Sequence, residues 1–281
     1  MTPLNSYKTD PLDLIDTIGQ QHAAVDFQLA APRIVCLVPS ITELLCDLGL
    51  APYLVGRTGF CIHPAAVVAN IPKIGGTKDV NIEKIRTLAP THLIVNIDEN
   101  EKPTVDALAQ FVPHVVVTHP MTPSDNLNLY RLLGGIFGAE EAAKALCTAL
   151  EQEIKAIRGA APATPKTVLY CIWKDPWMTV SRDTYIAAML AQIGWAHWQA
   201  EPSTATALAV RYPKFAWTLE VLDGIDEILL SSEPYRFTPE HVAELTQQSG
   251  KPVRLVDGEM LSWYGSRAIR GLRYLREIAS A

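Results

Sequence analysis

The sequence predicts an α/β protein of two lobes with mostly parallel sheets, joined by one long helix. Three observations lead to this prediction. The chain has 281 residues, which exceeds the usual domain size of roughly 100 to 150 residues. Short apolar runs alternate with amphipathic segments, an order typical of right-handed βαβ units. A long helical pattern lies near the middle, between two sets of expected strands.

The apolar runs have the length and the β-branched character of buried parallel strands. Amphipathic segments separate them, and we expect these segments to form helices that cover the sheets. The expected strands are residues 33–38, 92–95, 114–118, 167–172, 227–230 and 253–256. The expected helices between them are residues 41–48, 82–88, 104–111, 185–193 and 240–248.

The longest helical pattern covers residues 139–158, where Leu146, Leu150 and Ile154 recur at a spacing of four. Such a helix would be roughly 30 Å long and could act as a stiff connection between lobes. The alternative is one more helix packed on a single large sheet. The expected division is an N-terminal extension and hairpin at 1–32, a first lobe at 33–138, the interlobe helix at 139–160 and a second lobe at 161–281.

Composition limits the classes of function. The formal net charge is −6, whereas proteins that bind nucleic acid concentrate lysine and arginine, so we expect no nucleic-acid partner. No apolar stretch approaches the roughly 20 residues of a membrane-spanning helix. The five scattered cysteines do not form a disulfide framework. With no leader pattern at the amino terminus, these cysteines favour the cytoplasm, and the alternative is a periplasmic protein whose leader was removed.

Catalytic signatures are absent from the sequence. It contains no phosphate-binding loop, no dinucleotide fingerprint, no nucleophile elbow and no zinc-protease motif. We expect Gly75 to Asp79 to form a plain turn, although its backbone amides could bind an anion. Cys61 and His63 alternate on an extended segment and could supply two metal ligands, while ordinary loop packing is the competing interpretation. The sequence therefore favours a binding protein over an enzyme.

Several motifs, in order, resemble one family. They are Arg33-Ile-Val-Cys-Leu-Val-Pro-Ser-Ile-Thr-Glu43, Gly75-Gly-Thr77 and Asn81-Ile-Glu83, then Trp173-Lys-Asp-Pro-Trp177 and Asp257 through Arg267. Together they resemble the class III periplasmic binding proteins, the helical-backbone metal receptors of ABC importers for cobalamin and ferric siderophores. The cobalamin-receptor-like branch is the most similar, and the resemblance covers roughly residues 15 to 280.

The resemblance implies two Rossmann-like lobes on a rigid helix, with the ligand held in the cleft between the lobes. It implies a substrate-binding protein of an ABC-type importer that binds a corrinoid or ferric siderophore, acts as a monomer, requires no cofactor and performs no chemistry. Glu83 and Glu220 match the acidic residues that dock on the importer's membrane subunits. Each lies in the first turn of an expected helix, where a carboxylate also stabilises the helix dipole. The alternative function is cytoplasmic handling of a metal or metal chelate, on the same fold and without a transporter.

The sequence departs from the cobalamin receptors where these line the first lobe with tryptophan. Lys78 and Asn96 stand at the matching places, and Phe60 replaces another aromatic residue, which favours a smaller or more anionic chelate than cobalamin. Ligand contacts are expected on the loops that follow strands, where open α/β sheets bind ligands. The candidates are Arg57, Phe60, Cys61, His63, Lys78, Asn96 and Glu99 in the first lobe, and Trp173, Trp177, Arg182, Tyr235, Arg236, Trp263 and Tyr264 in the second.

Overall fold

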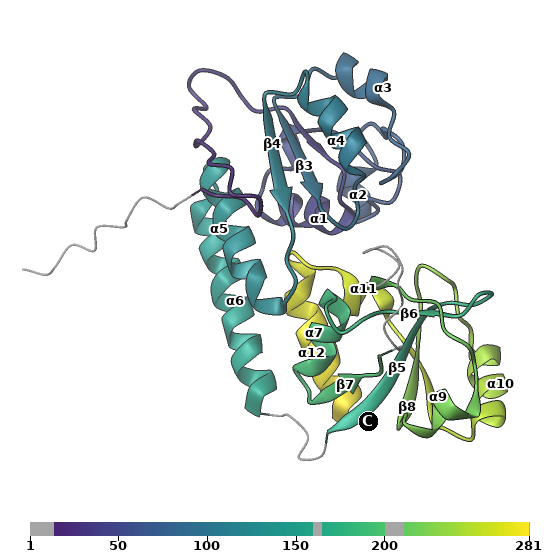
Figure 1. The fold of residues 1–281 in the computed structure, drawn as a ribbon. Coiled ribbons are helices and arrows are strands. Elements are labelled where there is room, and N and C mark those ends of the chain that lie inside the picture. Colours follow the sequence, from purple (N-terminus) through teal and green to yellow (C-terminus); the bar gives the residue numbers. More distant parts are fainter. Residues whose placement is uncertain (1–13, 160–164, 200–210, 281) are drawn as a thin grey trace, which may run out of the picture. The chain divides into compact units, whose positions relative to one another are not determined.

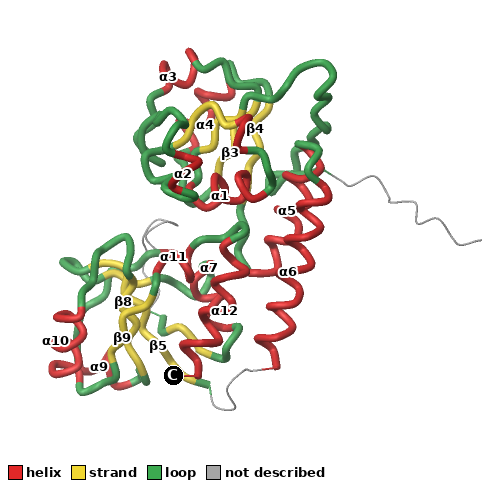
Figure 2. Tube along the Cα trace, turned by 180° about the vertical axis from the view of Figure 1, so that it is seen from behind, coloured by secondary structure: helices red, strands yellow, loops and turns green. Residues whose placement is uncertain are grey.

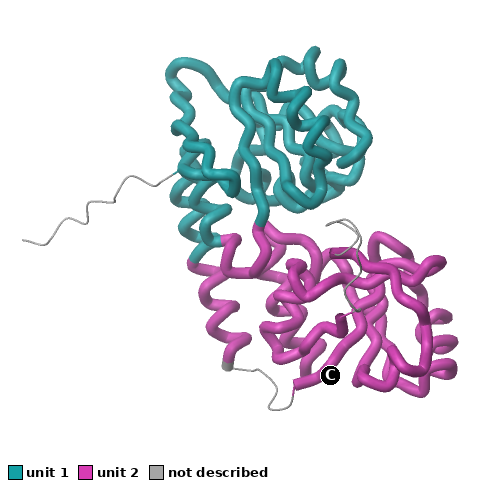
Figure 3. Tube along the Cα trace, viewed as in Figure 1, with its two compact units in different colours: residues 1–119, 127–147 teal, residues 120–126, 148–281 magenta. Residues whose placement is uncertain are grey.

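The computed structural model describes residues 14–159, 165–199 and 211–280 (Figure 1). It divides into two compact units, coloured separately in Figure 3. Unit 1 contains residues 1–119 and 127–147, and unit 2 contains residues 120–126 and 148–281. Each unit has its own sheet, so the predicted two-lobed α/β fold is confirmed, and the alternative of a single large sheet is wrong.

The sheet of unit 1 has four parallel strands in the order β2-β1-β3-β4. Their order reverses between β1 and β3, which is a switch point at which open α/β sheets bind ligands. The strands are β1 (Ile34–Cys36), β2 (Leu54–Arg57), β3 (His92–Asn96) and β4 (His114–Thr118). The helices of this unit are α1 (Pro39–Asp47), α2 (Ala65–Val68), α3 (Ile82–Thr87), α4 (Lys102–Ala109) and α5 (Asn126–Ile136), with the 3₁₀ turns η1 (Ala51–Tyr53) and η2 (Pro123–Asp125) beside them in sequence.

The core of unit 1 explains why these segments form strands. All five residues of β3 are buried, as expected for a central parallel strand with both faces covered. Ile85 of α3 and Leu108 of α4 pack with Val35 and Leu93 in one fully buried cluster. The amphipathic faces of both helices are therefore turned toward the sheet, and the sheet's carboxyl edge is left to the loops.

The sheet of unit 2 has five strands, in the order β6-β5-β8-β9, with β7 paired to β5. Only the two-residue β6 is antiparallel to its neighbour. Helices α7, α11 and α12 cover one face, and α9 and α10 cover the other (Figures 1 and 2). The strands are β5 (Lys166–Trp173), β6 (Met178–Thr179), β7 (Trp195–His197), β8 (Glu227–Ser231) and β9 (Val253–Val256). The helices are α7 (Tyr185–Ala191), α9 (Leu219–Asp223), α10 (Pro239–Ser249), α11 (Gly258–Ser262) and α12 (Arg267–Ser280).

The predicted long helix is α6 (Glu140–Gly159), twenty residues long. The division between the units falls inside it, after Cys147. In unit 1 its first half packs closely on α5, because Gly134 leaves no side chain against Ala143. In unit 2 its second half is tied to α12 through Glu153. Gly134 therefore allows two helices to pack closely. Gly138 has a φ of +63° and lies between the end of α5 and the start of α6.

Strands β2, β6 and β7 were not among the predicted strands. They have four, two and three residues, which is too short for a recurring pattern to separate strand from loop. The strands and helices that were predicted occur within a few residues of their expected bounds. No helix in the described part of the chain is long and apolar enough to cross a membrane.

Candidate ligand-binding site

The strands of each sheet point their carboxyl ends to one edge, and most predicted site residues lie there. In unit 1 this edge is formed by the residues that follow β1, β2, β3 and β4. In unit 2 it is formed by the residues that follow β5, β8 and β9. We describe the two edges separately, beginning with unit 1.

The loop after β2 presents one exposed aromatic side chain. Arg57 ends this strand and is only 4% exposed. Its Nε donates to the carbonyl of Val68 at 2.7 Å, and its Nη1 donates to the carbonyl of Thr58 at 3.1 Å. Phe60, three residues later, is 63% exposed. The structure thus places Arg57 in the framework of the loop and Phe60 on its surface.

Cys61 is fully buried below the same loop. The hydroxyls of Thr42 and Thr58 each lie 3.1 Å from its sulfur, and burial raises the pKa of the thiol. Since a metal is bound by the thiolate, this environment disfavours the ligating form. His63 is half-buried two residues later. Among the described residues, no group of three or more His, Cys, Asp or Glu could hold a metal ion, so the Cys61 and His63 site stays a prediction without a third ligand.

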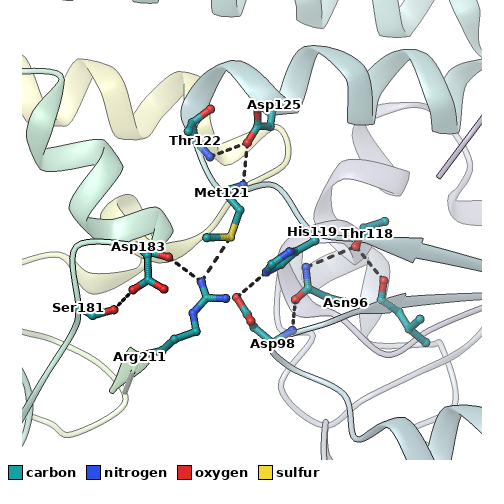
Figure 4. Close-up of polar contacts among 11 residues, drawn as sticks. Asn96, Asp98, Thr118, His119, Met121, Thr122, Asp125, Ser181, Asp183 and Arg211 are labelled. Atoms are coloured by element: carbon teal, nitrogen blue, oxygen red, sulfur yellow. Dashed lines mark hydrogen bonds and ion pairs between the residues drawn. The ribbon is translucent and has the colours of Figure 1, made fainter. Parts of the chain in front are cut away.

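Asn96 ends β3 and organises the loop behind it (Figure 4). Its backbone amide donates to Asn100 Oδ1 at 2.9 Å, and its side-chain oxygen accepts from the amide of Asp98 at 2.8 Å. Thr118, at the end of β4, donates to the carbonyl of Val95 at 2.8 Å. Asn96 is 2% exposed, so these contacts make it a structural anchor of the edge. Glu99 lies half-buried in the same loop.

Lys78 lies on a tight turn that is closed by an antiparallel β-bridge between Gly75 and Val80. Gly75 has a φ of +110°, and a Cβ there would lie 2.3 Å from the carbonyl oxygen of Asp79. The amide of Gly76 donates to that same carbonyl at 2.7 Å. This bond uses an amide that an anion would need, which supports the plain turn. Lys78 is exposed at the turn.

In unit 2, Trp173 ends β5 and is 39% exposed. Its ring contacts that of Tyr235 edge-on, with 5.5 Å between the centroids, and Arg236 is exposed beside it. Trp177 lies differently. It is half-buried, its ring stacks on Phe237 and lies 4.6 Å from the ring of Trp217, and it packs against the core of unit 2.

The remaining unit 2 candidates have packing partners. Trp263 and Tyr264 are 9% and 8% exposed. The guanidinium of Arg267 lies 4.5 Å from the centre of the Trp263 ring, and Tyr264 contacts the ring of Tyr185 edge-on at 5.8 Å. Arg182 is exposed, and its Nε donates to the carbonyl of His197 at 2.8 Å.

Arg211 follows the undescribed segment 200–210 and is anchored in unit 2. Its Nη2 donates to the carbonyl of Asp183 at 3.0 Å and contacts the sulfur of Met121 at 3.3 Å (Figure 4). The hydroxyl of Ser181 also donates to the Asp183 carboxylate. These contacts hold Arg211 beside the loop that precedes α7.

A pocket of about 460 Å³ opens at the carboxyl ends of β8 and β9. Glu233 lies in it, and sequence reasoning did not select this residue. Burial raises the pKa of its carboxyl, and the nearby Glu259 acts in the same direction. The sequence signal was its position three residues after a predicted strand. The pocket is lined by Ser232, Glu233, Phe237, Leu255, Val256, Asp257 and Glu259.

The two proposed docking residues have matching surroundings. Glu83 is in the first turn of α3, whose N-cap Asn81 accepts a hydrogen bond from the amide of Lys84. Glu220 is in the first turn of α9, whose N-cap Thr218 accepts from the amide of Val221. Both glutamates are exposed. The structure thus places both glutamates in the first turn of a capped helix, as the sequence predicts. Their docking on a transporter stays a prediction.

Each unit is an α/β unit with a mostly parallel sheet whose carboxyl edge is built from loops, which is where open α/β sheets bind ligands. Residues 34–208 match the model of the periplasmic binding protein family. The chain therefore belongs to this family, in its class III, cobalamin-receptor-like group. The family is one of binding proteins.

Two curated relatives have related functions. The chain is 28% identical over 189 residues to YvrC of Bacillus subtilis, an ABC transporter substrate-binding lipoprotein, with 64% of this chain and 58% of that protein covered. It is 26% identical over 167 residues to the vitamin B12-binding protein of Photorhabdus laumondii, with 59% and 60% covered. The chain thus spans about three fifths of the length of these relatives.

Solved structures share the fold over nearly their whole length. The periplasmic vitamin B12 binding protein BtuF of Vibrio cholerae matches with a TM-score of 0.75 at 20% identity, covering 89% of this chain and 98% of that one. The periplasmic heme binding protein HutB of Vibrio cholerae matches with a TM-score of 0.71 at 23% identity, covering 89% and 99%. At these identities the likeness shows the fold alone.

The prediction of a cytoplasmic protein is wrong, because the relatives are periplasmic proteins and a lipoprotein. The prediction relied on the missing leader pattern and on five scattered cysteines without a disulfide framework, and the structure shows why the cysteines were a poor guide. Cys36, Cys61, Cys147 and Cys171 are buried free thiols, and Cys46 is half-buried. A buried thiol whose pKa is raised forms little thiolate, which is the form that oxidises. Free thiols of this kind are therefore compatible with a compartment that is not reducing.

Proposed function

We propose that this chain is the substrate-binding component of an ABC-type importer and binds a metal chelate. The observation that carries the proposal is family membership, together with a B12-binding relative and an ABC-transporter relative. The ligand class is a corrinoid, a related macrocycle or a ferric siderophore. The protein requires no cofactor of its own, the chelate is cargo, and the chain acts as a monomer.

The exposed aromatic residues of the two carboxyl edges support this ligand class. Phe60 in unit 1 and Trp173 in unit 2 both follow or end strands, and both leave ring surface open to solvent. Flat apolar rings of this kind stabilise a macrocycle through burial and stacking. Their place at the carboxyl edges, where open α/β sheets bind ligands, favours contact with a large, partly apolar ligand.

Binding can be measured by isothermal titration calorimetry with cobalamin, cobinamide, haem and a set of ferric siderophores. Replacing Phe60 or Trp173 with alanine should weaken binding of the responding ligand roughly tenfold, by removing about 1 to 3 kcal/mol of ring contact. Phe27→Ala is the matched control, because Phe27 is also partly exposed and contacts Tyr53 away from the edge. Failure of all these chelates to bind would refute the proposed function.

A further inference from the structure

Glu233 is a carboxylate with one occupied oxygen and one available oxygen. Its Oε1 accepts hydrogen bonds from the hydroxyl of Ser262 at 2.8 Å and from Nε1 of Trp263 at 3.1 Å. Within the described residues, Oε2 receives no hydrogen bond. Two fixed donors on one oxygen hold the carboxyl plane, so the second oxygen is presented in a defined direction.

The local backbone is shaped to admit this side chain. Gly258 begins α11 directly beside it, and a Cβ at Gly258 would lie 2.7 Å from Cγ of Glu233 and 2.4 Å from Oγ of Ser231. Any larger residue would therefore displace the glutamate. The amide of Gly258 also donates to Oγ of Ser232 at 2.9 Å, which joins the loops after β8 and β9.

The other acidic groups of the pocket have their own partners. Asp257 caps α11 by accepting a hydrogen bond from the amide of Met260 at 3.2 Å, and Glu259 pairs with Arg267. The remaining lining residues are Ser232 and the apolar side chains of Phe237, Leu255 and Val256. Glu233 thus differs from Asp257 and Glu259 in that two side-chain donors fix one oxygen and direct the other, in a pocket whose other lining residues are half apolar and half polar.

A carboxylate only accepts hydrogen bonds, and its burial is stabilised by a donor or a cation. A ligand carboxylate placed here would instead be repelled. We infer that Glu233 receives an N–H-bearing edge of the ligand, so that the protein selects chelates edged by amides or a protonated amine over chelates edged by carboxylates. This inference rests on the proposed function and concerns the part of the ligand that contacts unit 2.

Two matched pairs of chelates test the inference by calorimetry. Ferrioxamine B has a free protonated amine that its N-acetyl derivative lacks, while the iron coordination is the same. Cobinamide is edged by amides, whereas cobyrinic acid has the same corrin ring edged by carboxylates. Where a pair binds, we expect the wild-type chain to have about tenfold higher affinity for the amine or amide member than for the other member. A charge-assisted hydrogen bond contributes a free energy of that size.

The variant Glu233→Gln keeps an acceptor for Ser262 and Trp263 but removes the charge, and should reduce the preference to within about threefold. Glu277→Gln is the control, because Glu277 is exposed on α12 of the same unit and the charge change is equal. Equal melting temperatures would show that both variants fold. A preference that is absent, reversed or unchanged in Glu233→Gln overturns the inference while leaving the proposed function intact. If neither member of either pair binds, the inference fails, and if cobalamin, haem and the other ferric siderophores also fail to bind, the proposed function fails with it.

Discussion

Glu153 of α6 accepts a hydrogen bond from Arg273 of α12, with 2.6 Å between Arg273 Nε and Glu153 Oε1. Its second oxygen accepts from Nη2 of Arg276 at 2.7 Å. Glu153 is 8% exposed, and the two guanidinium groups compensate the loss of water around its carboxylate. This contact fastens the second half of the long helix to the last helix of unit 2.

Replacing Glu153 with glutamine should destabilise the protein by about 1 to 3 kcal/mol, because a partly buried charge pair loses one member. Urea unfolding followed by circular dichroism measures the change. Asp106→Asn is the comparison: Asp106 pairs with Lys102 at 2.7 Å on the surface, where such pairs contribute roughly 0 to 1 kcal/mol. Equal effects of the two substitutions would contradict the assigned role of Glu153.

Two buried histidines should make stability depend on pH. Burial lowers the pKa of His92 to about 4, and the neighbouring His114 and His22 add to the shift. Burial also lowers the pKa of His197 to about 4. In the unfolded chain both titrate near 6.5, so protonation favours unfolding. Their contribution is fully present above pH 6.5 and is lost as the pH falls through 4, by up to about 3 kcal/mol each.

The variant His92→Gln separates this effect from the titration of carboxyl groups. Its free energy of unfolding should change less than that of the wild type between pH 6.5 and pH 4, measured by urea unfolding at a series of pH values. His63→Gln serves as the control, since His63 is only half-buried. A wild-type slope retained in full by His92→Gln would show that His92 binds its proton equally in the folded and unfolded states, against a lowered pKa.

Gly134 should not tolerate alanine. Its Cβ would lie 2.6 Å from that of Ala143 and 3.3 Å from the carbonyl oxygen of Ala139, so α5 and α6 would have to separate. We expect Gly134→Ala to cost about 1 to 3 kcal/mol, although alanine alone favours a helix by roughly 1 kcal/mol. Gly224→Ala has open space and should be near neutral. The double variant with Ala143→Gly should recover most of the loss, and no recovery would argue against this contact as the cause.

Much of the fold could be predicted because it depends on periodicity and burial. The pattern of Leu146, Leu150 and Ile154 identified α6 because a helix of five turns repeats its stripe often enough to be recognised. β2 was missed because four residues that include Gly56 carry no such repeat. Recognition of the family came from ordered motifs, which preserve loop residues that periodicity cannot place.

The candidate site was harder to predict, since a sequence does not show where a loop side chain finds its partners. Arg57 and Asn96 were selected for their position after strands, yet their polar groups bond to nearby backbone and become buried. Trp177 follows a strand too, but its half-buried ring packs against the core. Glu233 was overlooked because an isolated glutamate before a proline is typical of an exposed loop. Its importance depends on Ser262 and Gly258, which are distant in sequence.

The proposed docking role of Glu83 and Glu220 predicts a separation of transport from binding. Glu83→Lys and Glu220→Lys place a repulsive charge where arginines of the importer's membrane subunits would dock. Together they should reduce stimulation of the reconstituted importer's ATPase activity about tenfold or more, because like charges at an interface cost several kcal/mol. Chelate affinity should stay within about twofold, because neither glutamate is among the residues expected to contact the chelate. Glu101→Lys with Glu277→Lys reverses two other exposed charges, and an equal loss of stimulation there would show a general charge effect instead of specific docking.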